Sequence, residues 1–283
     1  MSELHDKLAE MVDKMPAFST SVTKVLQLTS DINCSPKALV EVIDHDPIMT
    51  VKILKLVNSA YFGLSKEIVS IKQGVVILGI NTLKNLAITI AAMGMLPQKS
   101  DSKFNSENFL LHSLGTATIS KLLAQKIGVS SKDATDYFVA GLLHDFGKVV
   151  LAQFMAEEME KSFELAAAQN IPLVEAEMQI IGSDHTELGG LLGEKWQLPK
   201  DLVTSLKEHH HPTTEGESTK MRDCVTAANL IIKMAEFGDA GSPVIEALPA
   251  PACERFGMNL EELYESLGDI SDDLEKTRVF ASL

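Results

Sequence analysis

The chain has 283 residues, of which 45% are hydrophobic, so it can bury a substantial core in one large domain or two of ordinary size. Aromatic residues make up only 5%, which leaves Leu, Ile, Val, Ala and Met to fill the core and favours helices over sheets. The formal net charge is −14 and no dense Lys/Arg run offsets it. Because such a charge repels phosphate backbones, direct binding of nucleic acid is not expected.

The sequence gives no sign of export or of membrane insertion. Its first residues, Met1-Ser2-Glu3-Leu4-His5-Asp6, lack the basic and apolar regions of a signal peptide. The most apolar segment, residues 86–96, is about half the length needed to span a bilayer. The three cysteines are widely spaced and form neither a disulfide framework nor a CxxC metal clip. We therefore expect a soluble protein of the cytoplasm without a membrane partner.

Short helices are predicted for the first third of the chain. Ser35-Pro36 and Asp46-Pro47 each place a cap residue before a proline at the first helical position, which predicts two helix starts. Gly79 ends a further helix, and Asn81 is predicted to cap the next one. The other helices expected in this part span residues 3–15, 22–29, 71–78 and 83–95.

The polar stretch of residues 97–108 predicts a boundary between subdomains. Beyond it, apolar spacing predicts helices over residues 109–119, 131–144, 148–169, 185–196, 200–210 and 221–236. No alternating strand pattern with hairpin turns occurs, so the predicted fold is all-α. The expected organisation is an N-terminal helical subdomain (1–97), a helical core (98–238) and a C-terminal helical extension (239–283).

Histidines gather on or at the ends of the apolar helices. They are His112, His144, His185, His209 and His210, and Asp145 supplies a carboxylate beside one of them. Imidazole is a common neutral metal ligand, and a carboxylate can bridge two ions. A dinuclear centre of this kind can activate water for attack on a phosphoryl group.

Each histidine taken alone is more often a hydrogen-bonded core residue than a ligand, by about three to one. Taken jointly, the five favour a present or ancestral metal site. His5, His45 and His211 are predicted to be surface residues. Lys148 follows His144 by one helical turn, where it could contact a phosphate, although a solvated lysine at a helix end is the more ordinary role.

The order of these motifs resembles an HDOD domain, the output-type relative of the HD phosphohydrolases. The resemblance rests on His112, on His144-Asp145-Phe-Gly-Lys148, and on Asp184-His185-Thr-Glu-Leu-Gly189. It continues with Trp196-Gln-Leu-Pro199 and His209-His210-His211-Pro212, and the leader region 15–80 adds Leu56-Val57-Asn58-Ser59-Ala60-Tyr61-Phe62-Gly63. The similarity runs from Met15 to about Glu236, and it implies an HD-like helical bundle.

The resemblance also implies a set of metal ligands. His112, His144 and Asp145 match the HD pattern, and His185, His209 and His210 resemble the additional ligands of the HD-GYP subgroup, which degrades cyclic di-GMP. Asn229 stands where the HD pattern has its last Asp, and the GYP element is absent after His210. Because Asn offers one neutral oxygen, it holds a divalent ion less tightly than a carboxylate does. The ion implied is Fe, Mn, Mg or Zn, and the site is also compatible with no ion.

Two functions follow from the resemblance and the ligand count. The first is a signalling module with a degenerate metal site, which acts by contacts with proteins of two-component or cyclic-dinucleotide pathways. The alternative is a metal-dependent phosphohydrolase that acts on a nucleotide or another phosphate ester. A single certain acidic ligand, Asp145, is a low number for a hydrolytic dinuclear centre, so the signalling module is favoured. Met-rich helices leave a homodimer open as a further expectation.

Overall fold

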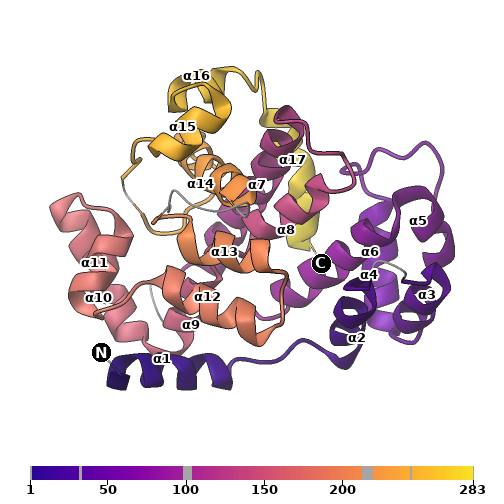
Figure 1. The fold of residues 1–283 in the computed structure, drawn as a ribbon, viewed down its shortest axis with the longest axis horizontal. Coiled ribbons are helices and arrows are strands. Elements are labelled where there is room, and N and C mark those ends of the chain that lie inside the picture. Colours follow the sequence, from indigo (N-terminus) through magenta and orange to yellow (C-terminus); the bar gives the residue numbers. More distant parts are fainter. Residues whose placement is uncertain (1, 32–33, 98–103, 212–218, 243, 283) are drawn as a thin grey trace.

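The architecture was obtained as a computed structural model, which describes residues 2–31, 34–97, 104–211, 219–242 and 244–282 (Figure 1). These residues contain helices and no strand, so the all-α prediction is confirmed. The helices are α1 (Ser2–Lys14), α2 (Thr20–Thr29), α3 (Pro36–Asp44), α4 (Pro47–Val57), α5 (Ile71–Leu78), α6 (Ile80–Met93), α7 (Ser106–Lys126), α8 (Ala134–Leu143), α9 (Phe146–Phe154), α10 (Ala156–Gln169), α11 (Leu173–Ile180), α12 (His185–Lys195), α13 (Lys200–Glu208), α14 (Thr219–Met234), α15 (Ala250–Phe256), α16 (Leu260–Glu265), α17 (Ser271–Thr277) and the 3₁₀ helix η1 (Arg278–Ser282).

Local capping chemistry fixes several of the helix starts. The proline starts of α3 and α4 lie where they were predicted, and the Asp46 side chain accepts a hydrogen bond from the Met49 N–H. The predicted cap at Asn81 is wrong, because α6 already begins at Ile80 after Gly79. The Asn81 amide instead donates to the Lys132 carbonyl and to Asp136, and so joins α6 to the region of α8. The Asn81 side chain therefore makes a tertiary contact in place of the predicted capping hydrogen bond.

The single helix predicted over residues 148–169 is also wrong. Met155, with φ −138° and ψ 47°, leaves helical geometry and divides the segment into α9 and α10. Its side chain is buried, so the break turns the chain toward the core. As a result α9 is short, and its first turn carries the residues that follow Asp145.

The 21-residue helix α7 runs through the middle of the molecule, with α8 and α14 packed along it (Figure 1). A Cβ atom added at Gly141 of α8 would lie 2.7 Å from the Ala117 Cα and from the Thr116 carbonyl oxygen, both in α7. Only glycine permits this close approach of two backbones. His112 in α7 is thereby brought near the end of α8, where the His-Asp pair lies.

The first helix is fastened to the core by side chains of α12. The Lys195 ammonium donates to the carbonyl oxygens of Val12, Asp13 and Met15 at 2.7–2.9 Å, at the end of α1 where carbonyls lack partners within the helix. The Trp196 ring stacks on Phe18 with ring centroids 4.5 Å apart. One hydrophobic cluster continues from Leu8 in α1 to Phe280 in η1. Residues 98–103, within the predicted boundary, lie outside the described residues, and the three-part division stays a prediction.

No single helix in the described ranges is long and apolar enough to cross a membrane. By length and composition alone, α5 and α6 taken together are long and apolar enough for a membrane span, although they are bent by 120° at their junction.

Candidate metal centre

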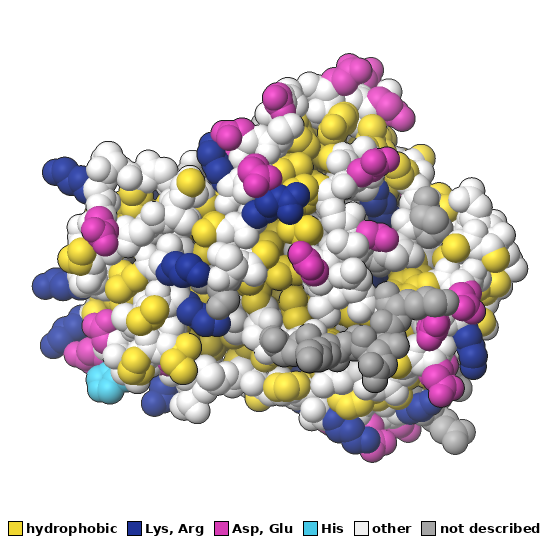
Figure 2. Space-filling model, turned by 180° about the vertical axis from the view of Figure 1, so that it is seen from behind, with side chains coloured by type: hydrophobic (Ala, Val, Ile, Leu, Met, Phe, Trp, Pro, Cys, Tyr) yellow, Lys and Arg dark blue, Asp and Glu magenta, His cyan; other side chains and the backbone are white. Residues whose placement is uncertain are grey.

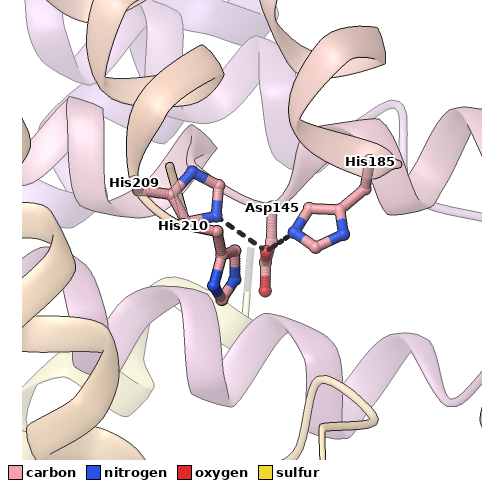
Figure 3. Close-up of side chains that lie close together, drawn as sticks. All are labelled: Asp145, His185, His209 and His210. Atoms are coloured by element: carbon pink, nitrogen blue, oxygen red, sulfur yellow. Dashed lines mark ion pairs between the residues drawn. The ribbon is translucent and has the colours of Figure 1, made fainter. Parts of the chain in front are cut away.

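Asp145 lies at the junction of α8 and α9, at the centre of a ring of buried histidines (Figure 3). His144 continues the last turn of α8, and Asp145 has φ −96° and ψ 8°, a turn conformation that aims its carboxylate inward. Both residues are fully buried. The two carboxylate oxygens face two different groups of side chains, which together contain every histidine predicted as a ligand.

The first group surrounds Oδ2 of Asp145. His144 Nε2 lies 3.3 Å and His112 Nε2 3.8 Å from this oxygen, and their role as ligands stays a prediction. Lys148 occupies the remaining side, with Nζ 2.7 Å from Oδ2 and 3.1 Å from the Ala240 carbonyl oxygen.

The second group surrounds Oδ1. His185 Nε2 lies 3.1 Å and His209 Nε2 3.5 Å from this oxygen, and Figure 3 shows the two rings on opposite sides of the carboxylate. His210 completes the group, since its nearest ring nitrogen and the ligand atoms of the other three residues lie within 4.8 Å of one another. Asp145 is the one carboxylate in either group, within the part of the chain that the structure describes.

Hydrogen bonds to Nδ1 fix the orientation of the histidine rings. His144 Nδ1 donates to the Gly141 carbonyl at 2.7 Å, and His209 Nδ1 donates to the Leu206 carbonyl at 3.0 Å. His185 Nδ1 lies 2.6 Å from Glu177 Oε2, a buried carboxylate of α11. Because Nδ1 of His144 and of His209 donates to a carbonyl, the Nε2 lone pair of each of these two rings points at the centre, the arrangement that metal ligands require.

The residues fit a divalent metal ion. The Nε2 atoms of His112, His144, His185 and His209 and Oδ1 of Asp145 are buried atoms without a hydrogen-bond partner among the described residues. Unsatisfied buried acceptors are costly, and an ion bound among them would remove that cost. The nitrogen-rich ligand set suits Zn²⁺ or Fe²⁺ better than Mn²⁺ or Mg²⁺, which prefer oxygen ligands.

Burial and charge shift the titration of these groups in opposite directions. Burial lowers the pKa of His209 to about 4, and it holds the pKa values of His112 and His210 well below the ordinary value. Burial alone would raise the pKa of Asp145, but His144 and Lys148 hold it well below its usual range. Burial alone would lower the pKa of His185, but Glu177 outweighs it and raises that pKa to about 9. The centre therefore presents an ionised carboxylate and neutral imidazoles at His112, His209 and His210, which are the forms that bind metals, whereas His185 must release a proton when an ion binds.

Lys148 is not the solvated lysine that its position at a helix end suggested. Its side chain is 2% exposed, and its ammonium group points to Asp145 and Ala240 instead of solvent. The contact with Asp145 follows from the i,i+3 spacing, which places the two side chains on one face of the first turn of α9. The phosphate contact suggested for Lys148 stays a prediction.

Asn229 is buried beside the second group, and its Oδ1 atom has no hydrogen-bond partner among the described residues. With His209, His210 and Glu246 it lines a cavity of about 30 Å³. Its position next to two predicted ligands is the one that the HD pattern implied, and its role as a ligand stays a prediction. The three other histidines differ in setting: His5 and His45 are exposed as expected, whereas the exposed His211 is anchored 2.8 Å from Asp184 Oδ2.

Two carboxylates next to the centre escaped the sequence-based prediction. Glu177 orients His185, and Glu246 lies 3.6 Å from His210 Nδ1. Glu177 is one of two glutamates in the apolar segment Leu173–Ile180, so an acid in a buried helix was a usable signal, but nothing distinguished it from Glu175. Glu246 lies in a Pro/Gly-punctuated stretch that offered no pattern.

Comparison with protein families matches residues 15–212 to the HDOD domain, which is more than half of the chain. The chain belongs to the HDOD domain family. The match ends at residue 212, before the expected limit at Glu236. Helix α14 with Asn229, and the segment with Ala240 and Glu246, therefore form part of the centre from outside the HDOD match.

Solved structures show the same fold. An HDOD domain protein of unknown function from Geobacter sulfurreducens superposes with a TM-score of 0.80 at 21% identity, covering 98% of this chain and 96% of its own. A protein of Shewanella amazonensis, provisionally named a phosphohydrolase, gives 0.74 at 24% identity and covers 96% and 97%. A protein of Marinobacter aquaeolei, provisionally named a signal transduction protein, gives 0.75 at 17% identity and covers 99% and 66%.

Among curated proteins, an uncharacterized protein of Treponema pallidum is 27% identical over 264 residues, which is 92% of this chain. The HDOD chain spans about half the length of that relative (50%).

Proposed function

We propose that this HDOD protein is a signalling module whose degenerate metal centre binds at most one divalent ion and which acts through contacts with other proteins. The contact between Lys148 and Asp145 carries the proposal, because an ammonium group 2.7 Å from Oδ2 occupies the place of a second cation. The ion would be held by Asp145, His185, His209 and His210, where it would supply a Lewis acid.

Electrostatics disfavours a second ion in the first group. Two unit charges 4 Å apart near a protein surface interact by about 4 kcal/mol, so a divalent ion next to the Lys148 ammonium would be repelled by about 8 kcal/mol. His112 and His144 offer only neutral nitrogens against this repulsion, and the remaining charge of Asp145 is already shared with Lys148. A two-ion hydrolytic centre is therefore not supported by these residues.

The burial of the centre also argues against hydrolysis of a phosphate ester. His144 and His185 are fully buried, and the His210 side chain is only 7% exposed. The cavity beside His209 and His210 has a volume of about 30 Å³, which is the space of roughly one water molecule. A phosphate ester is several times larger, so this cavity is too small to hold it beside His209 and His210.

The surface of the N-terminal helices supports a role in protein contacts. Ile48 and Val51 of α4 are 72% and 66% exposed, and they share a helix face with Lys52 and Lys55. Within residues 47–77 four lysines and one glutamate give a net charge of +3 on a chain of net charge −14. Figure 2 views the molecule from behind, and the end that carries α3–α5 shows hydrophobic side chains among basic and acidic ones. An exposed apolar surface with basic side chains suits an acidic protein partner.

Metal analysis of the purified protein, combined with phosphatase and phosphodiesterase assays in Mn²⁺ or Fe²⁺, tests the proposal. We expect no more than one ion per chain and no turnover of nucleotide or other phosphate-ester substrates. The alternative, a metal-dependent phosphohydrolase, is favoured by the number of imidazoles, and it predicts turnover that is lost in Asp145→Ala. That result would contradict the proposed signalling module and support the phosphohydrolase.

Asn229→Asp is expected to raise the affinity for a divalent ion about tenfold, because a carboxylate replaces a neutral oxygen beside His209 and His210. Without metal the same variant should be less stable, since it buries a second negative charge beside Glu246. Titration with Mn²⁺ and unfolding with and without metal measure both effects. Asn170→Asp, at an exposed position, is the matched control. Equal affinities of the two variants would show that Asn229 takes no part in the site.

A further inference from the structure

His210 differs from the other ligands of the second group in how its ring is oriented. The Nδ1 atoms of His185 and His209 have partners nearby in sequence, Glu177 and the Leu206 carbonyl. The Nδ1 atom of His210 instead lies 3.6 Å from Oε2 of Glu246, which comes after α14 and beyond the family match. This contact between a neutral imidazole and a carboxylate leaves the other ring nitrogen of His210 for the centre, as in the carboxylate–histidine–metal pattern seen at metal sites.

The segment that carries Glu246 contacts the centre at two further points. The Lys148 ammonium, which holds Asp145, donates to the Ala240 carbonyl at 3.1 Å. The Lys233 ammonium donates to the Val244 carbonyl at 3.3 Å and lies 3.8 Å from Glu246 Oε2. The segment is therefore anchored by Lys148, which contacts Asp145, and by Lys233, which contacts Glu246 beside His210.

Close backbone packing shows that the segment is built for this position. Gly238 has φ +74°, and a Cβ atom there would collide with the His112 backbone N and with Asn108 O, 2.5 Å away. Gly241 has φ +84°, and a Cβ atom there would collide with the Phe163 ring. The Asp239 N–H donates to the Asn108 carbonyl at 3.1 Å. The chain thus passes against α7 and α10 before it reaches His210.

We infer that Glu246 is the positioning residue of the metal ligand His210, and that an ion bound at the centre holds residues 239–242 and 244–249 closed over it. This inference rests on the metal binding of the proposed function. Since a bound ion needs His210 turned inward, and Glu246 stabilises that orientation, metal binding and docking of the segment favour one another. The state of the centre is thereby transmitted to the C-terminal helices that follow, α15–α17.

Zn²⁺ affinity, measured by chelator competition on the full chain, tests the positioning role. Glu246→Ala should weaken Zn²⁺ binding about tenfold or more, as is usual when the partner of a metal-bound histidine is lost. Glu246→Gln keeps the shape of the side chain without its charge, so its affinity should lie between Glu246→Ala and the wild type. Glu254→Gln makes the same charge change at an exposed position nearby, and its affinity should equal that of the wild type.

Hydrogen exchange with and without Zn²⁺ separates positioning from a general loss of stability. Zn²⁺ should slow exchange in residues 239–242 and 244–249 and in α12 of the wild type. In Glu246→Ala the protection of residues 239–242 and 244–249 should be lost, while that of α12 remains. Zn²⁺ affinity and protection in Glu246→Ala equal to those of Glu254→Gln would overturn the inference and leave the metal centre standing. Absence of Zn²⁺ binding in the wild type would overturn the metal centre itself.

Discussion

Lys148→Met is expected to raise the number of divalent ions bound per chain from one to two. The substitution removes the ammonium group from Oδ2 of Asp145 while it keeps most of the side-chain volume. Oδ2, His112 and His144 then face one another without a cation between them, which is the first of the two ligand groups. Metal analysis after loading with Mn²⁺ or Zn²⁺ and removal of free ion measures the change.

The same substitution should make the metal-free protein markedly less stable. Lys148 is 2% exposed and forms the shortest contact of the buried Asp145, so its removal takes the nearest cation from a buried carboxylate. Breaking a buried ion pair at one partner costs about 3–5 kcal/mol. Addition of metal should restore most of this loss, since the ion replaces the missing charge. Chemical unfolding with and without metal gives the two values.

Lys132→Met is the matched control for Lys148→Met, because Lys132 is exposed and the change of residue is the same. It should leave both the metal content and the free energy of unfolding unchanged. A Lys148→Met protein that still binds one ion, with wild-type stability, would show that Lys148 does not stand in for a cation. The proposal of a degenerate centre would then lose the observation that carries it.

The contrast between the histidines and Lys148 shows what local sequence can reveal about the site. The candidate ligands were found because His112, His144 and His185 lie on apolar helices in an order typical of a family. The partners that complete the centre depend on tertiary placement: Glu177 reaches His185 from a neighbouring helix, and Glu246 reaches His210 from beyond the family match. No periodicity or spacing in the sequence connects these pairs.

The same distinction holds for the fold. The starts of α3 and α4 were predicted because a proline at the first helical position acts within one turn of the helix, and at α4 the Asp46 cap acts there too. The cap at Asn81 was wrong because its amide finds partners around α8, far along the chain. The break at Met155 was missed since the residue is an ordinary helix former and gives no local signal of a helix end. Local interactions were predictable, and contacts between distant elements were not.

Gly147→Ala is expected to destabilise the protein by more than about 4 kcal/mol and to abolish metal binding. A Cβ atom at Gly147 would collide with the His185 carbonyl oxygen and would lie 2.9 Å from the backbone N of Gly189. Both are backbone atoms of α12, so no side-chain rotation can relieve the overlap, and α9 and α12 must move apart. His185 Nε2, now 3.1 Å from Oδ1 of Asp145, would leave the centre with its helix.

Gly189→Ala tests whether this effect comes from the close approach of the two helices or from loss of a glycine in the HDOD core. Gly189 is also buried, and it lies within α12 across from Gly147, but the nearest atom to an added Cβ is 3.6 Å away, on Leu206. That is ordinary contact, and alanine is favoured over glycine inside a helix by about 0.5–1 kcal/mol. Gly189→Ala should therefore keep its metal and be at least as stable as the wild type. Chemical unfolding and metal content compare the two variants directly. Equal stability of the two would mean that α9 and α12 are not held by backbone contact, and that His185 is brought to Asp145 by the metal itself.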